Sequence, residues 1–238
     1  MQISLIIPAY NEEKYIGTCL DYVTKNSNGK FFEIIVIDNA STDGTAKVAL
    51  NYPNVRVVYE DKKGLTKARQ RGFIESKGDI LAYIDADTQM PYGWYEKVLE
   101  EFTKNKNLVC LSGPAYYYDI SKFRQFLIKT FYWKILAMPI YFLVRYMIMG
   151  SNFVIRKDIL EKIGGFDTSI EFYGEDTNIA RRASRLGKVK FKMNFNIFMS
   201  GRRLKSQGFY KTGFIYIINY LSEIFIHKPI TLNYKDFR

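Results

Sequence analysis

Hydrophobic residues gather in short runs along the first half of the chain. The runs at 3–7 (ISLII), 33–37 (EIIVI) and 80–84 (ILAYI) are rich in isoleucine and valine and nearly uninterrupted. This pattern is typical of strands buried on both faces. Residues 55–59 predict a further strand. Together these runs predict a parallel sheet within residues 1–118.

The segments between these runs have a helical period. Residues 12–25, for example, place Tyr15, Ile16, Cys19, Leu20 and Val23 on one face. The same spacing predicts helices over 42–50, 66–76 and 95–102. Strands that alternate with helices are typical of a doubly wound α/β fold, in which helices flank a mostly parallel sheet.

The second half of the chain contains two apolar segments, 135–144 (ILAMPIYFLV) and 214–226. Both are shorter than the roughly 20 residues needed to span a bilayer. The residues just before segment 135–144 have a helical period. One side of this predicted helix carries Phe123, Phe126, Leu127 and Thr130, and the other carries the polar residues Lys122, Gln125 and Lys129. This pattern indicates a helix lying on a membrane surface, with Trp133, Tyr141 and Tyr146 at the headgroups, or a helix that covers the protein's own core.

The amino-acid composition excludes a disordered protein and favours an intracellular one. With 47% hydrophobic and 25% charged residues, the 238-residue chain lacks the signature of disorder. Low cysteine content (Cys19 and Cys110), together with an N-terminal apolar run too short for a secretory signal, favours the cytoplasm.

The net charge of +11 belongs to the second half of the chain. Residues 1–118 carry 14 basic and 15 acidic residues, whereas residues 119–238 carry 21 and 9. This excess of positive charge indicates an anionic partner, which could be phosphate groups, a lipid surface or nucleic acid. Nucleic acid fits least, because the basic residues are interleaved with apolar runs and no nucleic-acid-binding motif is present.

Acidic residues follow three predicted strands. Glu12 follows the first, Asp38 follows the second, and Asp85 and Asp87 follow the third. Because the carboxyl ends of parallel strands meet at one edge, these side chains are expected to converge. Two carboxylates spaced as DxD suit Mg²⁺ or Mn²⁺. The alternative is that they solvate a strand end or cap a turn.

Six segments together resemble the family 2 glycosyltransferases with the GT-A fold: PAYNEE at 8–13, VIDNASTDGT at 36–45, GLTKARQRGF at 64–73, YIDAD at 83–87, GSNFVIRKDILEKIGGFD at 150–167 and GEDTNIARR at 174–182. The resemblance covers residues 1 to about 205. It implies a sugar donor linked to UDP or GDP, a Mg²⁺ or Mn²⁺ ion, and inversion at the anomeric carbon.

The resemblance also implies roles for single residues. It assigns nucleotide binding to Ala9, Asn11, Glu12, Asp38, Lys67, Arg69, Asp85 and Ala86. Asp87 would hold the metal, with Asp85 on the ribose or on a metal-bound water. The alternatives are a helix cap for Asp38 and its neighbours, and plain surface charges for Lys67 and Arg69.

Two later pairs complete the implied site. Asp176 would be the catalytic base and Glu175 would position the acceptor. Both carboxylates precede a predicted helix, where acids are favoured for stability alone and where the helix dipole lowers the carboxyl pKa. Arg202 and Arg203 would bind the diphosphate, or else face lipid or solvent.

The sequence thus predicts a nucleotide-sugar half (1–118), an acceptor and catalytic-base half (119–205) and an amphipathic C-terminal segment (206–238). The expected activity is hexosyl transfer to a lipid-linked acceptor, such as a polyprenyl phosphate or glycolipid, or to a saccharide, at the inner face of the cell membrane. A non-catalytic protein that binds donor or membrane is the main alternative.

Overall fold

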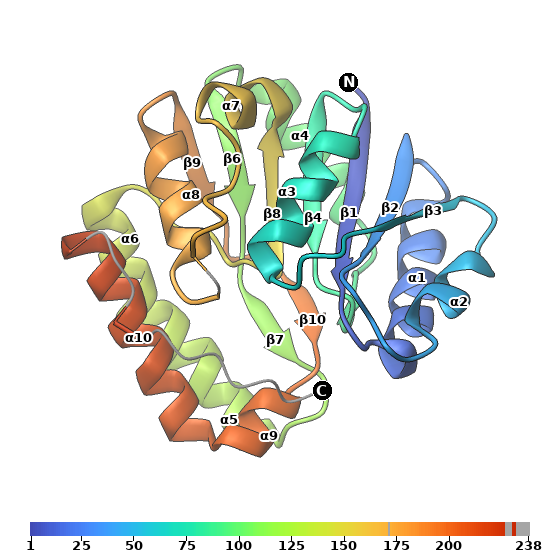
Figure 1. Ribbon diagram of the computed structural model, residues 1–238. Coiled ribbons are helices and arrows are strands. Elements are labelled where there is room, and N and C mark those ends of the chain that lie inside the picture. Colours follow the sequence, from blue (N-terminus) through green and yellow to red (C-terminus); the bar gives the residue numbers. More distant parts are fainter. Residues whose placement is uncertain (171, 227–229, 232–238) are drawn as a thin grey trace.

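A seven-stranded sheet forms the centre of the computed structural model, which describes residues 1–170, 172–226, 230 and 231 (Figure 1). The strand order is β3-β2-β1-β4-β8-β6-β9. Only β8 runs antiparallel to its neighbours, so the mostly parallel sheet is confirmed. The strands are β1 (Ile3–Ala9), β2 (Glu33–Asp38), β3 (Val55–Tyr59), β4 (Ile80–Ile84), β6 (Leu108–Ser112), β8 (Asn152–Arg156) and β9 (Lys188–Phe191).

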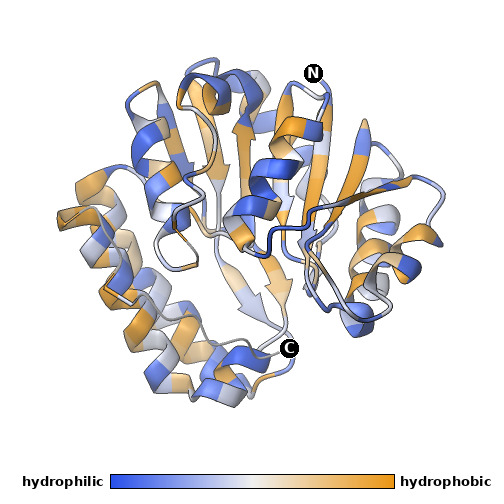
Figure 2. Ribbon diagram, in the orientation of Figure 1, coloured by the Kyte–Doolittle hydropathy of each residue, from blue (hydrophilic) through white to orange (hydrophobic). Residues whose placement is uncertain are grey.

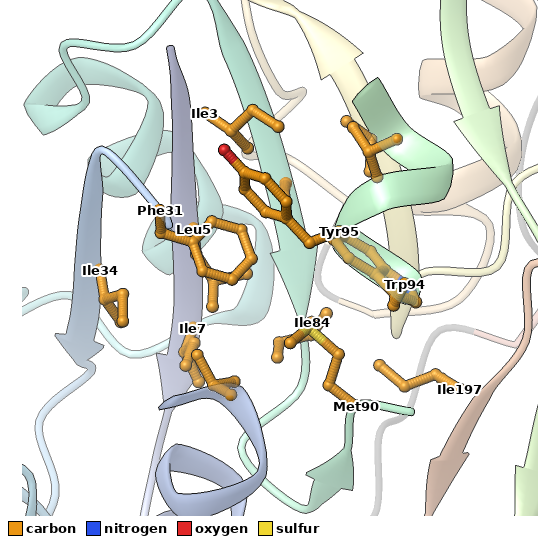
Figure 3. Packing of buried hydrophobic residues seen from close by; sticks show 14 of the residues in the cluster. Ile3, Leu5, Ile7, Phe31, Ile34, Ile84, Met90, Trp94, Tyr95 and Ile197 are labelled. Carbon is orange, nitrogen blue, oxygen red and sulfur yellow. The ribbon is translucent and has the colours of Figure 1, made fainter. Parts of the chain in front are cut away.

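Helices cover both faces of this sheet because the buried strands are apolar on both sides. In β1, Ile3, Leu5 and Ile7 pack on one face (Figure 3). Ile6 packs on the other face. The first face is covered by α1 (Glu13–Ser27), α2 (Thr45–Leu50) and α4 (Trp94–Lys104). The second is covered by α3 (Leu65–Glu75), α7 (Lys157–Lys162) and α8 (Glu175–Ser184).

The predicted helices of the first half lie within two residues of the observed ones, except at 42–50. That helix begins only at Thr45, because a hydrogen-bonded turn precedes it. The Asp43 carboxylate accepts a hydrogen bond of 3.0 Å from the Thr45 amide, and the Asn11 side-chain oxygen accepts one of 2.8 Å from the Thr42 amide. The turn therefore joins the loop after β1 to the loop after β2.

A small second sheet extends beyond the carboxyl ends of the parallel strands (Figure 1). It consists of β5 (Thr88–Gln89), β10 (Ile197–Met199) and β7 (Ala115–Tyr117). The Ser200 amide donates to the Asp87 carbonyl at 3.2 Å, and α9 (Arg202–Gln207) follows immediately. The second sheet thus carries the paired arginines to the DxD residues.

Two helical segments form an arm beside this second sheet (Figure 1). One runs without a break through α5 (Lys122–Leu127), the π-helix η1 (Ile128–Ala137) and α6 (Met138–Val144). The other is α10 (Phe209–Phe225), whose Phe209 and Tyr220 pack against the hydrophobic cluster that includes Trp133 of η1. The C-terminal segment predicted at 206–238 also includes residues 227–229 and 232–238, which lie outside the described residues.

The first helical segment of this arm corrects one expectation and bears on another. The run Lys122–Val144 has 23 residues and is long and apolar enough to cross a membrane by length and composition. The expectation that this apolar segment is too short to span a bilayer was wrong, because the helix continues on the N-terminal side of residues 135–144. Of the two alternatives left open for the three aromatics, the structure shows contacts with the protein: Trp133 stacks on Phe191, the Tyr141 hydroxyl donates to the Val189 carbonyl, and Tyr146 packs beside the core.

Candidate active site

The loops after β1 and β2 are bound to each other. Ala9 and Asp38 are register partners on the two strands, and Asp38 accepts a hydrogen bond of 3.1 Å from the Ser41 amide. Asn11 has a left-handed backbone conformation (φ 51°), and its backbone N–H donates a hydrogen bond to the Ser41 hydroxyl at 3.0 Å. These predicted nucleotide-binding residues therefore lie together, as the sheet topology requires.

A cavity of about 720 Å³ opens at the carboxyl end of the sheet. The predicted site residues that line it are Glu12, Arg69, Asp85, Ala86, Asp87, Glu175, Asp176, Arg202 and Arg203. Residues from five separate segments of the chain meet there. Four others that the resemblance assigns, Ala9, Asn11, Asp38 and Lys67, lie outside this lining.

Arg69 is the buried cation at the centre of the site. Its side chain is 1% exposed and lies 3.0 Å from a Glu175 oxygen and 3.6 Å from an Asp85 oxygen. It also donates to the Gly150 carbonyl at 2.8 Å. By contrast, Lys67 is only two residues away on α3 and points to the opposite side, where its amine donates to the Lys63 carbonyl. The two basic residues predicted together thus have different surroundings.

Gly150 permits this close packing, a role that the sequence reasoning missed. A β-carbon at this position would lie 2.9 Å from a guanidinium nitrogen of Arg69 and 3.2 Å from a Glu175 oxygen. Its amide donates to Asp176 at 3.2 Å. The glycine in the GSN triplet at 150–152 was the available signal.

Glu175 and Asp176 begin α8 and differ in their partners. Glu175 is held by Arg69 in an ion pair. Asp176 accepts hydrogen bonds from the Gly150 amide and from the amide and hydroxyl of Thr177. Within the described part of the chain, no cation lies at ion-pair distance from Asp176. Of the two carboxylates, Asp176 is therefore the one available to a proton from a bound molecule.

Burial raises the pKa of both carboxyls. For Glu175 the charge of Asp176 adds to the effect of burial, while Arg69 opposes it. For Asp176, burial is again the largest cause, and Arg69 again opposes it. The helix end alone predicts a lowered pKa. The direction is reversed because desolvation of a charged carboxylate outweighs the helix dipole.

Asp85 and Asp87 offer oxygen ligands to the cavity. Asp87 is 7% exposed and its carboxylate lies 3.2 Å from a guanidinium nitrogen of Arg202, so it already faces a cation. No cluster of three or more potential metal ligands occurs among the described residues. One or two carboxylates nevertheless fit Mg²⁺ or Mn²⁺, which take their remaining ligands from phosphates and water.

The two arginines of α9 are held by stacking and charge. Arg202 forms a bidentate ion pair with Glu12 and lies over the Tyr15 ring at 4.7 Å. Arg203 lies over the Phe172 ring at 4.2 Å. Asp119 accepts hydrogen bonds from the Gly201 amide and from Lys205, which fixes the start of the helix. Both guanidiniums thereby face the cavity.

The sequence reasoning also missed tyrosines that line the cavity beside the carboxylates. Tyr132 comes from η1, and Tyr216 and Tyr220 come from α10. The signal was present, because Tyr216 and Tyr220 are spaced by four in a helical segment and so share a face.

Comparison with known proteins agrees with this architecture. The family model described as Glycosyl transferase family 2 matches residues 4–164. The chain is 29% identical over 199 residues to glycosyltransferase AglE of Haloferax volcanii, covering 78% of this chain and 62% of AglE. It is 34% identical over 113 residues to the dolichol-phosphate mannosyltransferase of Pyrococcus furiosus, covering 45% of this chain and 32% of that protein. The chain therefore spans less than two thirds of either relative.

Solved structures share the fold. The mannosyltransferase PcManGT of Pyrobaculum calidifontis, in complex with GDP-Man and Mn²⁺, has a TM-score of 0.71 at 20% identity, covering 95% of this chain and 63% of that one. Glucosyl-3-phosphoglycerate synthase of Mycobacterium tuberculosis, in complex with Mn²⁺, UDP and phosphoglyceric acid, has a TM-score of 0.66 at 21% identity, covering 93% and 78%. At these identities the likeness shows the fold alone.

Proposed function

The chain belongs to glycosyl transferase family 2, and from that premise we propose that it moves a hexosyl group from a nucleoside diphosphate sugar to an acceptor, with inversion. The observation that supports this most is the convergence of the DxD carboxylates, the ED pair and two arginines in one cavity. The nucleoside of the donor would lie against the loops after β1 and β2, and its diphosphate would lie near Asp87 and Arg202. The GDP-Man bound to PcManGT and the UDP bound to the mycobacterial synthase are the precedents for this choice of donor.

In the proposed mechanism, Asp176 takes the proton from the acceptor hydroxyl as that oxygen attacks the anomeric carbon. Glu175 is held in place by Arg69 and orients the acceptor. A Mg²⁺ or Mn²⁺ ion held by Asp87 and Asp85 would neutralise charge on the leaving diphosphate. Arg202 and Arg203 would grip the same phosphates through their planar guanidiniums.

A thermal-shift experiment tests the donor site. UDP or GDP with Mn²⁺, at 100 times its dissociation constant, is expected to raise the unfolding midpoint by about 5–10 °C. The Asp87→Ala variant should lose at least half of this shift, because the metal would lose a carboxylate ligand. The matched control is Asp61→Ala, which changes an exposed aspartate outside the cavity.

The thermal-shift experiment has three informative outcomes. A shift that needs Mn²⁺ and that Asp87→Ala alone reduces supports the proposed donor site. An equal shift in both variants contradicts the role of Asp87, and no shift with either nucleotide contradicts donor binding.

We further propose that the acceptor is lipid-linked and that the arm rests on a membrane. The buried face of α10 is largely polar, with Thr212, Asn219, Ser222 and Glu223, while Phe214 and Phe225 are exposed. A helix at a water-facing surface has the opposite pattern. Hydrophobic residues also extend along α6 (Figure 2). Basic residues on the same arm, Lys122, Arg124, Lys129, Lys134, Arg145 and Lys211, suit an anionic surface.

The arm is proposed to lie at the interface, with the carboxyl end of the sheet facing the cytoplasmic leaflet. The helix at 122–144 has the length to span, but Ile128, Trp133 and Ala137 pack against the protein. Lys129 and Lys134 also interrupt its middle. These features favour a helix lying along the surface, with one side on the protein and the other on lipid.

Vesicle binding tests this arrangement. Leu143 is 79% exposed on α6, and Leu143→Glu is expected to weaken sedimentation with phosphatidylglycerol–phosphatidylcholine vesicles by about 10-fold or more, because burying a leucine contributes about 1.5–3 kcal/mol. The matched control is Leu50→Glu, which changes a leucine that is 65% exposed on α2. Equal loss in both variants, or none in either, contradicts the proposed surface.

The alternative of a non-catalytic donor-binding protein makes a different prediction. Such a protein would bind nucleotide with Mn²⁺ yet transfer no sugar to any acceptor. The cavity retains both ED carboxylates and both DxD carboxylates, which supports the catalytic proposal.

A further inference from the structure

The same cavity has an apolar part, the passage, which is lined by residues of both helical segments of the arm. One wall comes from the helix at 122–144, with Leu127, Phe131 and Leu136. The opposite wall comes from α10, with Phe214 and Ile217. Because polar and apolar parts belong to one continuous cavity, a molecule at Asp176 can extend an apolar chain between the two helices.

Tyrosine hydroxyls mark the point where the polar end meets this passage. The pKa of Tyr132 is raised by burial and by the charge of Asp176. The pKa of Tyr220 is raised by burial and, in smaller part, by Tyr132, Tyr146 and Asp176. Tyr132, Tyr220 and Asp176 also line the same cavity, so both phenols lie at its polar end.

The Tyr220 hydroxyl has an unmet hydrogen bond. It is buried and has no hydrogen-bond partner among the described residues. Such a group normally costs stability, and its presence in a cavity wall indicates a ligand that supplies the partner. The neighbouring Tyr216 hydrogen-bonds Arg203, so a cation lies at the same junction. An anionic or hydroxylated head would satisfy both features.

We propose that the passage between η1 and α10 holds the single hydrocarbon chain of an amphiphilic acceptor, and that Tyr220 hydrogen-bonds its phosphate or hydroxyl head beside Asp176. This inference rests on the proposed function and adds to it where the acceptor lies. The whole cavity, which would receive the donor's diphosphate as well as the acceptor, has a volume of about 720 Å³, within the range of about 300–1,000 Å³ that is usual for small-molecule sites.

Blocking the passage tests the site of the chain. Farnesyl phosphate and dodecyl phosphate, used below their micellar concentrations, serve as isoprenoid and straight-chain probes in isothermal titration. Ile217→Trp is expected to weaken the binding of the tighter-binding probe by at least 10-fold, because the larger side chain fills the passage. Ile226→Trp, at an exposed position just after α10 and outside the cavity lining, should leave its affinity unchanged. Equal affinity in both variants overturns the proposal.

Removing the Tyr220 hydroxyl tests its proposed hydrogen bond to the head group of the acceptor. Tyr220→Phe is expected to weaken farnesyl phosphate binding by about 3- to 10-fold, the usual value of one hydrogen bond. Its unfolding midpoint should stay the same or rise, because an unpaired buried hydroxyl is removed. The control is Tyr59→Phe, which changes an exposed tyrosine on β3. A lower midpoint with unchanged affinity would show a structural role and would overturn the assignment.

Donor binding is measured in the same samples to keep the two proposals apart. Ile217→Trp and Tyr220→Phe should keep the midpoint shift with nucleotide and Mn²⁺. If neither probe binds the unmodified protein while that shift persists, this inference is wrong and the transferase proposal stands. If the nucleotide shift is absent as well, both proposals are wrong.

Discussion

Replacing Asp176 with asparagine is expected to lower the rate of sugar transfer by about 100- to 10,000-fold, the usual contribution of a general base. Donor binding should remain, because the amide keeps an oxygen that can accept from the Gly150 and Thr177 amides. Transfer is measured with radiolabelled donor, and binding by the midpoint shift with nucleotide and Mn²⁺. Asp61→Asn serves as the control. Normal transfer by the Asp176 variant would eliminate this residue as the base.

The same proposal predicts a pH dependence. A base must be ionised, and burial raises the pKa of Asp176. The value of kcat/KM should therefore rise with pH through a pKa above the ordinary aspartate value of about 3.9. Because Glu175 interacts with Asp176, the apparent value belongs to the pair. A profile that is flat from about pH 4 to 7, with chemistry rate-limiting, would contradict the assignment.

The stability of the fold should respond with the opposite sign. Both carboxyls have raised pKa values in the folded state. Their contribution to stability is complete below the unfolded pKa values and is lost as the pH rises through the folded ones. Asp176→Asn removes one of the two groups, so its free energy of unfolding should fall less steeply over this range. Urea titrations at several pH values measure the difference.

Replacing Arg69 with methionine is expected to destabilise the fold by about 3–5 kcal/mol, because it leaves carboxylates without their buried cation. Arg69 lies against both Glu175 and Asp85. Transfer should fall as well, since Glu175 would lose the contact that orients it. Urea unfolding at pH 7 measures the stability, and the radiolabelled assay measures the transfer.

The control for this change is Arg71→Met on the same helix. Arg71 is 41% exposed and pairs with Glu75, so its loss should cost less than about 1 kcal/mol. The penalty for Arg69→Met should shrink at acidic pH, where protonated carboxyls need no cation. Equal effects of the two substitutions would contradict the central role of Arg69.

Much of the fold was predictable because its strands are buried on both faces. Runs such as 3–7 and 80–84 have no polar alternation, and this requires helices on both sides of the sheet. The antiparallel direction of β8 was not predictable in this way. Direction depends on the path of the preceding chain, here the long arm segment at 122–144, and leaves no trace in the apolar pattern of residues 152–156.

The sequence predicted that the acidic strand ends lie at one edge of the sheet, but it did not predict the contacts of the candidate site. Strand ends that share an edge bring Asp38, Asp85 and Asp87 to one side of the sheet, and this follows from topology alone. Which of Lys67 and Arg69 would be buried did not follow. The answer depends on Glu175, which is 106 residues away along the chain.

By itself, the sequence determined the alternation of strands and helices, the edge where the acidic residues gather and the family to which the chain belongs. These depend on local periodicity and on motifs of a few residues. Only the tertiary structure decided the direction of the carboxyl pKa shifts, the partner of Arg202 and the inverted polarity of α10. Burial and charge pairing arise from distant segments, such as Glu12 and Arg202, that meet only when the chain is folded.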